Sequence, residues 1–400
     1  MLEVNEFLVL DAVRANGTTT RLAIAEEVGL SPATVARAVT RLIRQGLISE
    51  DPGRRPGVGR PRAIIAFNMD AGGVIAVNLG AQWCRGVVTD LGGNIRGEYA
   101  LATHQAATAF ESLLATVRAL QLVASAAGLG ECVLAVSVPA ILDLDTGEAI
   151  DGPNLDWEHF DLLARLRSDV GLPVTVQNEA KLTALAHAWR GMGRGLADFA
   201  VLSIGTGVGG AVVANGQLLK GSHNVAGEIG YLLVDRAQVG HPMPGRLGGL
   251  ESVLAGPSIG RRASELVAFE PSSALATEGE ITARSVFEAA AGGDRLARRV
   301  VDEVLDHVAM AVISFAAVVD PRRVILDGAI GRALGPYTAD VAARVAPRLP
   351  NPPEIVASTL QPNARLLGAV AAGLELSHRK AVPSATFGMF RASTRDRVLP

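Results

Sequence analysis

A glycine-rich segment between two apolar runs most strongly constrains how this 400-residue chain can fold. It follows the β-favouring run Val201 to Ile204 and reads Gly205-Thr206-Gly207-Val208-Gly209-Gly210. Apolar residues resume through Val213, and Asn215-Gly216 then gives a strong signal for a tight hairpin. We therefore expect a strand, a glycine turn and a second strand. Such a turn lets the backbone approach a ligand closely, and its amide groups can bind ligand oxygens.

Glu228 lies beyond this hairpin and is flanked by Gly227 and Gly230, so its carboxylate can reach a ligand on the same side. The alternative is a glycine-rich β-turn that binds nothing, because short glycine motifs are common.

Charge is distributed unevenly along the chain. The net charge of −3 excludes a nucleic-acid-binding polycation, yet residues 31–66 hold seven Arg against two acidic residues. The only cysteines, Cys84 and Cys132, exclude a disulfide framework or a cysteine-rich metal site. The N-terminus does not have the pattern of a signal peptide, and no stretch of about 18 residues is apolar throughout. We therefore expect a cytoplasmic protein with no membrane span.

The first 66 residues have the pattern of three short helices followed by a two-stranded wing. Apolar spacing predicts a first helix over residues 5–15 and a second that ends at Val28. Ser31 caps a third helix, in which Pro32 takes the first position. In the second helix, the residues predicted to face inward are Leu22, Ala25 and Val28.

The third helix has a predicted buried stripe, formed by Val35, Val39, Leu42 and Ile43. The opposite face is predicted to carry Thr34, Arg37, Ala38 and Arg41, with Arg44 close by. This is the pattern of a helix-turn-helix whose third helix enters the DNA major groove. Arginine can bond guanine, and Ser and Thr hydroxyls often hold phosphates. The predicted DNA contacts on this helix are Ser31, Thr34, Arg37, Arg41 and Arg44.

Residues 47–50 and 62–68 are the predicted strands of the wing. The loop between them is extended and basic, which suits a minor groove or the phosphate backbone. Its predicted DNA contacts are Arg54, Arg55, Arg60 and Arg62. The alternative is a helical oligomerisation cap with a solvated charged loop, but an arginine face and an arginine-rich wing together favour DNA.

The rest of the chain is predicted to be α/β. Three strands, a helix over residues 108–127 and a fourth strand form a mixed sheet; the strands are 74–79, 84–90, 95–101 and 132–138. A helix over 161–169 and a strand over 174–177 follow, and this strand leads to Asn178-Glu179.

The strand–turn–strand pattern of residues 199–213 repeats the plan of residues 74–90. This duplication predicts two similar lobes with a cleft between them, where ligands tend to bind. The predicted elements of the C-terminal part are helices 285–291, 294–319 and 364–377 and a strand 323–326 that leads into Asp327-Gly328.

A winged helix-turn-helix joined to such a body resembles the ROK family of repressors, open reading frames and sugar kinases. The motifs that carry the resemblance are the winged unit, Gly205–Gly210, Gly227–Gly230 and Gly152-Pro153-Asn154-Leu155-Asp156-Trp157. The resemblance covers nearly the whole chain and implies an actin-like, hexokinase-like body. It implies a winged unit over residues 1–66, a first lobe over 67–180 and 364–378, a second lobe over 181–363, and a mobile tail over 379–400.

The resemblance also implies a sugar ligand. Its hydroxyls would contact Asn154, Asn178, Glu179, Glu228, Tyr231 and Glu251, beside the turn residues Gly205, Thr206 and Gly207. Carboxylates and amides can bind vicinal hydroxyls through paired hydrogen bonds. The alternatives are a turn-capping role for Asn154 and a helix-capping role for Glu251.

Three departures from the family pattern affect the implied chemistry. Asn78 stands where the first phosphate motif carries an Asp. Glu179 stands where the sugar-activating Asp is expected, and its extra methylene displaces the carboxylate of a general base. The four ligands of the family's structural zinc are replaced by Tyr231, Pro242, Pro244 and Gly249, and His241 alone cannot form a tetrahedral site. The sequence therefore predicts no metal and no cofactor.

These patterns favour a sugar- or sugar-phosphate-responsive regulator that binds operator DNA as a homodimer or homotetramer and does not phosphorylate its ligand. One alternative is a sugar kinase that uses Glu179 as its base. Another is a regulator that responds to a protein partner, with a vestigial sugar cleft.

Overall fold

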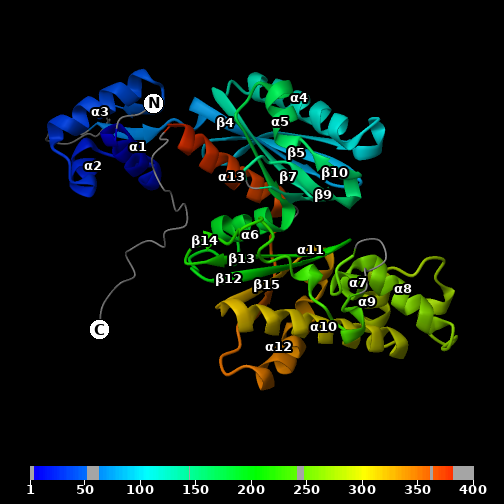
Figure 1. Cartoon of the computed structure of the whole chain (residues 1–400). Coiled ribbons are helices and arrows are strands. Elements are labelled where there is room, and N and C mark those ends of the chain that lie inside the picture. The colour runs from blue at the N-terminus through cyan, green and yellow to red at the C-terminus, as the bar shows by residue number, and fades with distance from the viewer. Residues whose placement is uncertain (1–3, 52–62, 144, 241–246, 361–363, 382–400) are drawn as a thin grey trace. The chain divides into compact units, whose positions relative to one another are not determined.

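The computed structural model describes residues 4–51, 63–143, 145–240, 247–360 and 364–381. These residues form two compact units, which we describe separately (Figure 1). The first unit contains the described residues of Met1–Val138 and Asp161–Gln177 and the part of the C-terminal helix that starts at Ala369. The second contains Pro139–Phe160 and Asn178–Gly368. Residues 139–160 were assigned to the first lobe on sequence, and the proposed lobe boundaries remain a prediction.

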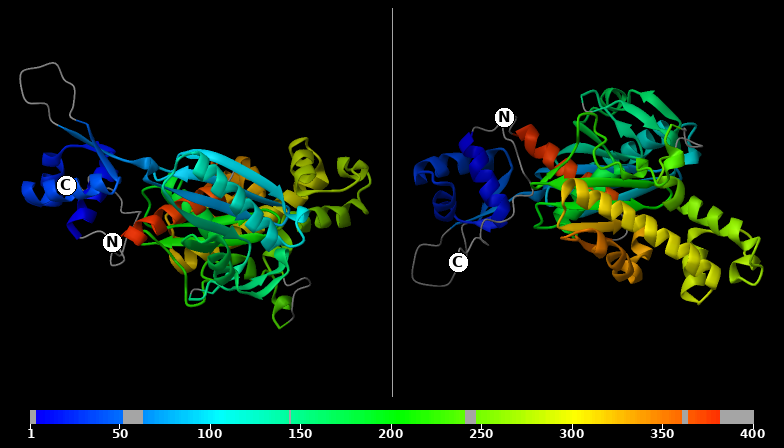
Figure 2. Two further views of the ribbon diagram at one scale, coloured as in Figure 1. Left: turned by 90° about the horizontal axis from the view of Figure 1, so that it is seen from above. Right: turned by 60° about the horizontal axis from the view of Figure 1, so that its bottom comes forward.

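The first unit begins with a winged helix-turn-helix. Its helices are α1 (Val4–Asn16), α2 (Arg21–Val28) and α3 (Pro32–Arg44). Its strands are β1 (Thr18–Thr19), β2 (Ile48–Asp51) and β3 (Ile64–Phe67), which pair in the order β1-β3-β2. Figure 2 shows β2 and β3 side by side as the predicted wing.

The buried residues of this domain correct two sequence predictions. Leu22 is exposed, whereas Ile24 and Ala25 of the same helix are buried. Ala38 was predicted to face outward but is buried with Val35. The buried residues of both helices pack into one apolar cluster, as hydrophobic burial requires.

A five-stranded sheet forms the centre of the first unit, in the order β11-β7-β4-β5-β6. Its strands are β4 (Gly72–Leu79), β5 (Trp83–Asp90), β6 (Ile95–Ala102), β7 (Glu131–Val138) and β11 (Val174–Asn178). Its helices are α4 (Ala109–Ala126) and α5 (Leu162–Val170). Helix α4 covers β4, β5 and β6. It is also the one helix among the described residues with the length and apolar composition of a membrane span.

A second five-stranded sheet forms the centre of the second unit, in the order β14-β13-β12-β15-β16. Its strands are β12 (Phe199–Ile204), β13 (Val208–Ala214), β14 (Gln217–Leu218), β15 (Arg323–Asp327) and β16 (Glu354–Ala357). Strands β12 and β13 form the predicted hairpin around the glycine turn. Asn215 and Gly216 both have positive φ, as a tight hairpin turn of this type requires.

The two sheets have the same plan. In each, the first strand of an antiparallel hairpin (β4 or β12) pairs on its other side with a parallel strand (β7 or β15). The predicted α/β fold with duplicated sheets is therefore confirmed. A separate three-stranded sheet of the second unit, β8 (Ile141–Leu142), β9 (Ala149–Gly152) and β10 (Trp157–Phe160), was not predicted.

The sheet of the second unit is covered on both faces. Phe199 and Val201 pack toward α6 (Glu179–Arg190), whereas Ala200 and Leu202 pack toward α10 (Arg295–Val319). The other helices of this unit are α7 (Glu251–Leu254), α8 (Gly256–Val267), α9 (Ala283–Ala291), α11 (Gly328–Ala333) and α12 (Thr338–Val345). The last helix, α13 (Ala364–Ala381), contributes residues to both units.

Helix α6 is joined to β15 by a buried pair of polar side chains. The Met192 amide donates to His187 Nδ1 (3.3 Å), so the other ring nitrogen, Nε2, carries the proton and donates to Asp327 Oδ2 (2.9 Å). Burial alone would raise the pKa of Asp327, but hydrogen bonds from His187, Ser358 and the Gly328 amide outweigh it and lower the pKa to about 2. Arg332 Nη1 also donates to this carboxylate (3.2 Å).

We expect Asp327→Asn to destabilise the protein at neutral pH. A fall in pKa from 3.8 to about 2 corresponds to roughly 2 kcal/mol of folding free energy. Because the pKa is lower in the folded state, this stabilisation is present above the unfolded value of 3.8 and is lost as pH falls through about 2. Urea unfolding at a series of pH values should show that the difference in free energy of unfolding between the parent and the variant becomes smaller as the solution is acidified. The control is Asp302→Asn, at an exposed acid paired with Arg344. An equal loss of unfolding free energy in both variants would contradict the stabilising role assigned to Asp327.

Candidate functional site

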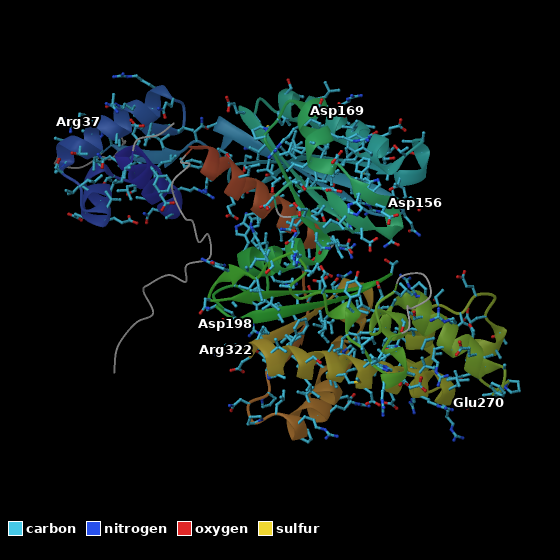
Figure 3. The ribbon with its side chains drawn as sticks, viewed as in Figure 1. Arg37, Asp156, Asp169, Asp198, Glu270 and Arg322 are labelled. Atoms are coloured by element: carbon cyan, nitrogen blue, oxygen red, sulfur yellow. The ribbon has the colours of Figure 1, made fainter. Side chains whose placement is uncertain are left out.

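The outward face of α3 is formed by residues at helical spacing: Ala33, Arg37, Thr40, Arg41 and Arg44. All five are exposed, and Figure 3 shows Arg37 on this helix. The buried stripe on the other side is Val35, Ala38, Val39 and Leu42. The helix therefore presents three arginines to solvent from a rigid, well-packed support, as a recognition helix must.

Not every predicted DNA contact on α3 is equally available. Arg41 Nη1 lies 2.9 Å from Glu6 Oε1, and the Glu6 side chain is buried while that of Arg41 is 48% exposed. Ser31 Oγ caps α3 by accepting from the Thr34 amide (3.2 Å), and the two hydroxyls are 2.9 Å apart. Arg41 is thus partly committed to holding α1 against α3. Arg37 and Arg44 are the better candidates for reading DNA.

The base of the wing is fixed to α2. Arg21 donates to both carboxylate oxygens of Glu50 (2.7 and 2.8 Å), which joins α2 to β2. The predicted wing contacts Arg54, Arg55, Arg60 and Arg62 lie outside the residues that the structure describes.

The glycine turn of the second unit is tied to α7. Val208 N donates to Glu251 Oε1 (3.1 Å), and a Cβ atom at Gly207 would lie 2.5 Å from the same oxygen. Gly205 N donates to Gly207 O (2.9 Å). The amides at both ends of the turn are therefore already paired, which leaves those of Thr206 and Gly207 as candidates for a ligand. Glu251 supports the turn as well as being a candidate contact.

Glu228 faces a buried lysine that sequence reasoning missed. Lys181, in the first turn of α6, has a fully buried side chain, and its Nζ lies 3.4 Å from Glu228 Oε1. Burial raises the pKa of Glu228, Lys181 lowers it, and Glu179 and Glu251 raise it again, so the net direction is upward. Glu228 is therefore influenced by the charges of Glu179 and Glu251 and is paired with Lys181. We call these four residues the group around Lys181.

Glu179 and Asn178 are both occupied by internal contacts. Arg365 Nε lies 3.2 Å from Glu179 Oε2, which links the start of α13 to the start of α6. Asn178 caps α6, because its Oδ1 accepts from the amides of Ala180 (2.8 Å) and Lys181 (3.4 Å). Its Nδ2 donates to Ala140 O (3.2 Å). The geometry gives Asn178 a structural role, and a ligand contact by this residue stays a prediction.

The other predicted contacts lie on short turns. Asn154 is exposed in the 3₁₀ turn Pro153–Leu155 that joins β9 to β10. Tyr231 ends the 3₁₀ turn Ile229–Tyr231, and its residue surface is 54% exposed. The roles of both in ligand binding remain predictions.

The described positions that replace the family's zinc ligands do not fit a metal ion. Gly249 has no side chain to offer, and Tyr231 is largely exposed. Pro242 and Pro244, with His241, lie outside the described residues. The segment is held by other means: Gln238 Oε1 accepts from the Val234 amide (2.8 Å), and a Cβ atom at Gly249 would lie 2.6 Å from Leu232 O. Among the residues described, we find no group of three or more potential metal ligands.

A cavity of about 290 Å³ lies between α7, α8 and α10, on residues that the sequence analysis did not single out. Its lining includes Ser252, Ile259, Arg262, Val300, Glu303 and His307. Arg262 is fixed across it by two hydrogen bonds to Glu303 (2.8 and 3.0 Å). None of Glu179, Lys181, Glu228 and Glu251 lines this cavity.

Lys181 and His187 are two polar residues of α6 that sequence reasoning overlooked. Their sequence context could have identified them. Both residues occur in a segment otherwise rich in alanine and leucine, and Lys181 is one of only three lysines in the chain. A rare charged residue in an apolar helix needs a partner, which makes it worth singling out.

Comparisons with known proteins agree with this architecture. The ROK family model matches residues 74–375, and a winged helix-turn-helix DNA-binding model matches residues 2–49. A glucokinase of Halalkalibacterium halodurans is 33% identical over 59% of this chain and 74% of its own length. A xylose repressor of Caldicellulosiruptor bescii is 26% identical over 81% of this chain and 82% of its own.

Among solved structures, a ROK family transcriptional regulator that is a homolog of the E. coli MLC protein aligns with a TM-score of 0.77 at 24% identity. The alignment covers 94% of this chain and 98% of that one, so the fold is shared from the winged domain through the body. With a family model that matches three quarters of its length, the chain belongs to the ROK family.

Proposed function

We propose that this protein is a DNA-binding transcriptional regulator of carbohydrate metabolism that responds to a sugar or sugar phosphate and acts as a repressor. The observation that carries the proposal is the joining of an arginine-faced winged helix-turn-helix to a ROK body in one chain. We further propose that it acts in the cytoplasm as a homodimer or homotetramer, because paired recognition helices match the two half-sites of an operator.

The group around Lys181 supports a sugar as effector. Carboxylates and a glycine turn offer several acceptors and amide donors within one unit, which suits a ligand with many hydroxyls. A relative that covers most of this chain is a xylose repressor. The ligand would act by binding two arrangements of the protein with unequal affinity. A ligand that binds both arrangements equally well does not shift the equilibrium between them.

We propose that the body does not phosphorylate its ligand. Asn78 stands in place of the expected acid, and the Glu179 carboxylate is committed to Arg365. A general base must be free to accept a proton at the right position, and displacement of such a group removes much of its contribution. Because one relative of this chain is a glucokinase, a direct assay for phosphoryl transfer tests this proposal.

Alanine at Arg37 or Arg44 should weaken operator binding. Loss of an arginine that reads a base should cost about 1–3 kcal/mol of binding free energy. Loss of one that holds a phosphate should reduce the slope of log K against log salt concentration by about one. Fluorescence anisotropy with an operator selected from random DNA measures both effects. Arg118→Ala, at an exposed arginine of α4, is the matched control. Equal affinity of the Arg37, Arg44 and Arg118 variants would contradict the assigned interface.

A sugar effector should raise the melting temperature of the parent protein and change its operator affinity. A ligand present at 100 times its Kd stabilises the folded state by about 2.7 kcal/mol. Glu228→Gln should abolish the shift, whereas Glu278→Gln, at an exposed acid of the same unit, should retain it. If operator binding is intact but no sugar or sugar phosphate changes it, control by a protein partner is the better explanation.

A coupled ATP assay with hexoses and N-acetylhexosamines should show no turnover above background. We expect this for two reasons: position 78 carries no acid, and the carboxylate of Glu179 is paired with Arg365. Turnover by the parent that disappears in Glu179→Ala would show instead that the protein is a kinase.

A further inference from the structure

Lys181 is an unusual residue for this chain. The sequence has only three lysines, and this one is completely buried in the first turn of α6. Burial of an ammonium group is costly unless an opposite charge compensates it. Its compensation is Glu228, whose Oε1 lies 3.4 Å from the Lys181 Nζ. The Glu228 side chain is still 14% exposed, so one partner of the pair can be reached from outside.

The other charges around Glu228 explain why a cation is needed there. Glu179 from the start of α6 and Glu251 from the start of α7 both act on Glu228 as like charges. Burial and these two acids raise the pKa of Glu228, and Lys181 is the group that opposes them. Burial in turn lowers the pKa of Lys181, which shows that the pair is held where neither charge is easily accommodated alone.

We propose that Lys181 is a positioning residue of the ligand site, which keeps Glu228 ionised as a hydrogen-bond acceptor and thereby selects an uncharged sugar over its phosphate ester. The inference rests on the proposed function, because it specifies the ligand of the same site. An ionised carboxylate accepts hydrogen bonds from hydroxyl groups, whereas a protonated one loses part of that capacity.

The charge count gives the preference for an uncharged ligand. The three acids Glu179, Glu228 and Glu251 stand against two cations, Lys181 and Arg365, and each cation is already within 3.4 Å of a carboxylate. A phosphate dianion would add charge of the same sign as the remaining excess, in surroundings where charges are poorly screened. We expect at least a tenfold preference for the free sugar.

The experiment is a calorimetric titration of the full chain with pentoses, hexoses and their terminal phosphate esters between about pH 5 and pH 8, because burial raises the pKa of Glu228 and loss of Lys181 should raise it further. The parent should bind a free sugar with a weaker pH dependence than the Lys181→Met variant, because Lys181 opposes the rise in the pKa of Glu228. Lys181→Met, which keeps the length of the side chain without its charge, should bind it near pH 8 but lose at least tenfold in affinity toward pH 5. Glu228→Gln should bind weakly at every pH. Lys220→Met removes an exposed lysine and should match the parent.

Two results would overturn the inference and leave the proposed function intact: tighter binding of a phosphate ester, or the same pH profile for Lys181→Met and the parent.

Binding of no sugar or ester would remove the proposed function, and a ligand-free measurement then decides the role of Lys181. Urea unfolding compares the single variant Lys181→Met with the double variant Lys181→Met/Glu228→Gln. The free energy of unfolding of the single variant should rise relative to that of the double variant as pH falls. The reason is that the pKa of Glu228 is raised in the folded state, which therefore binds a proton at a higher pH than the unfolded state does. Parallel pH curves for these two variants would show that Lys181 does not control Glu228.

Discussion

Burial of α6 on nearly all sides is the constraint from which the second unit is built. Nine consecutive residues, Ala180 to Ala188, are buried, so every polar group among them must find a partner within the protein. Lys181 reaches Glu228, Thr183 Oγ1 donates to Glu179 O (2.9 Å), and His187 donates to Asp327. A helix that is buried all round cannot rely on water, and its few polar side chains therefore fix the positions of whatever they contact.

Those contacts fall on segments that sequence reasoning had singled out for other reasons. Glu228 belongs to the glycine-flanked motif after the hairpin of β12 and β13, and Asp327 ends β15 at the turn into Gly328. Strand β15 is parallel to β12, and Asp327 is aligned with Ser203, just before the glycine turn. The helix thus ties the glycine-flanked motif and the strand-to-glycine turn of β15 into one structure. A substitution at Lys181 can therefore change the setting of Glu228, a proposed ligand contact, although α6 itself is buried.

Most of the fold could be predicted from the sequence, because strands, hairpin turns and helix caps leave local signals. Asn215-Gly216 identified a hairpin, and Ser31-Pro32 identified the start of α3. What could not be predicted was the partner of each polar side chain, since partners come from distant segments: Lys181 and Glu228 are 47 residues apart, and His187 and Asp327 are 140 apart. For the same reason Arg41 was assigned wholly to DNA, although Glu6 of another helix holds it. Ala38 was misplaced because alanine fits either face of a helix.

The proposed loss of kinase chemistry is compatible with an intact fold. Asn78 lies at the carboxyl end of β4 and is aligned with Ser137 of β7; Asn78 Oδ1 and Ser137 Oγ are both buried without a protein partner among the described residues. The strands that carry them are held by backbone pairing and apolar packing, to which the identity of residue 78 contributes little. Replacement of an acid here therefore alters what the sheet edge can bind without disturbing the sheet. In α6 the reverse holds, because its buried polar residues are bonded to the core and a change at any of them leaves a partner unpaired.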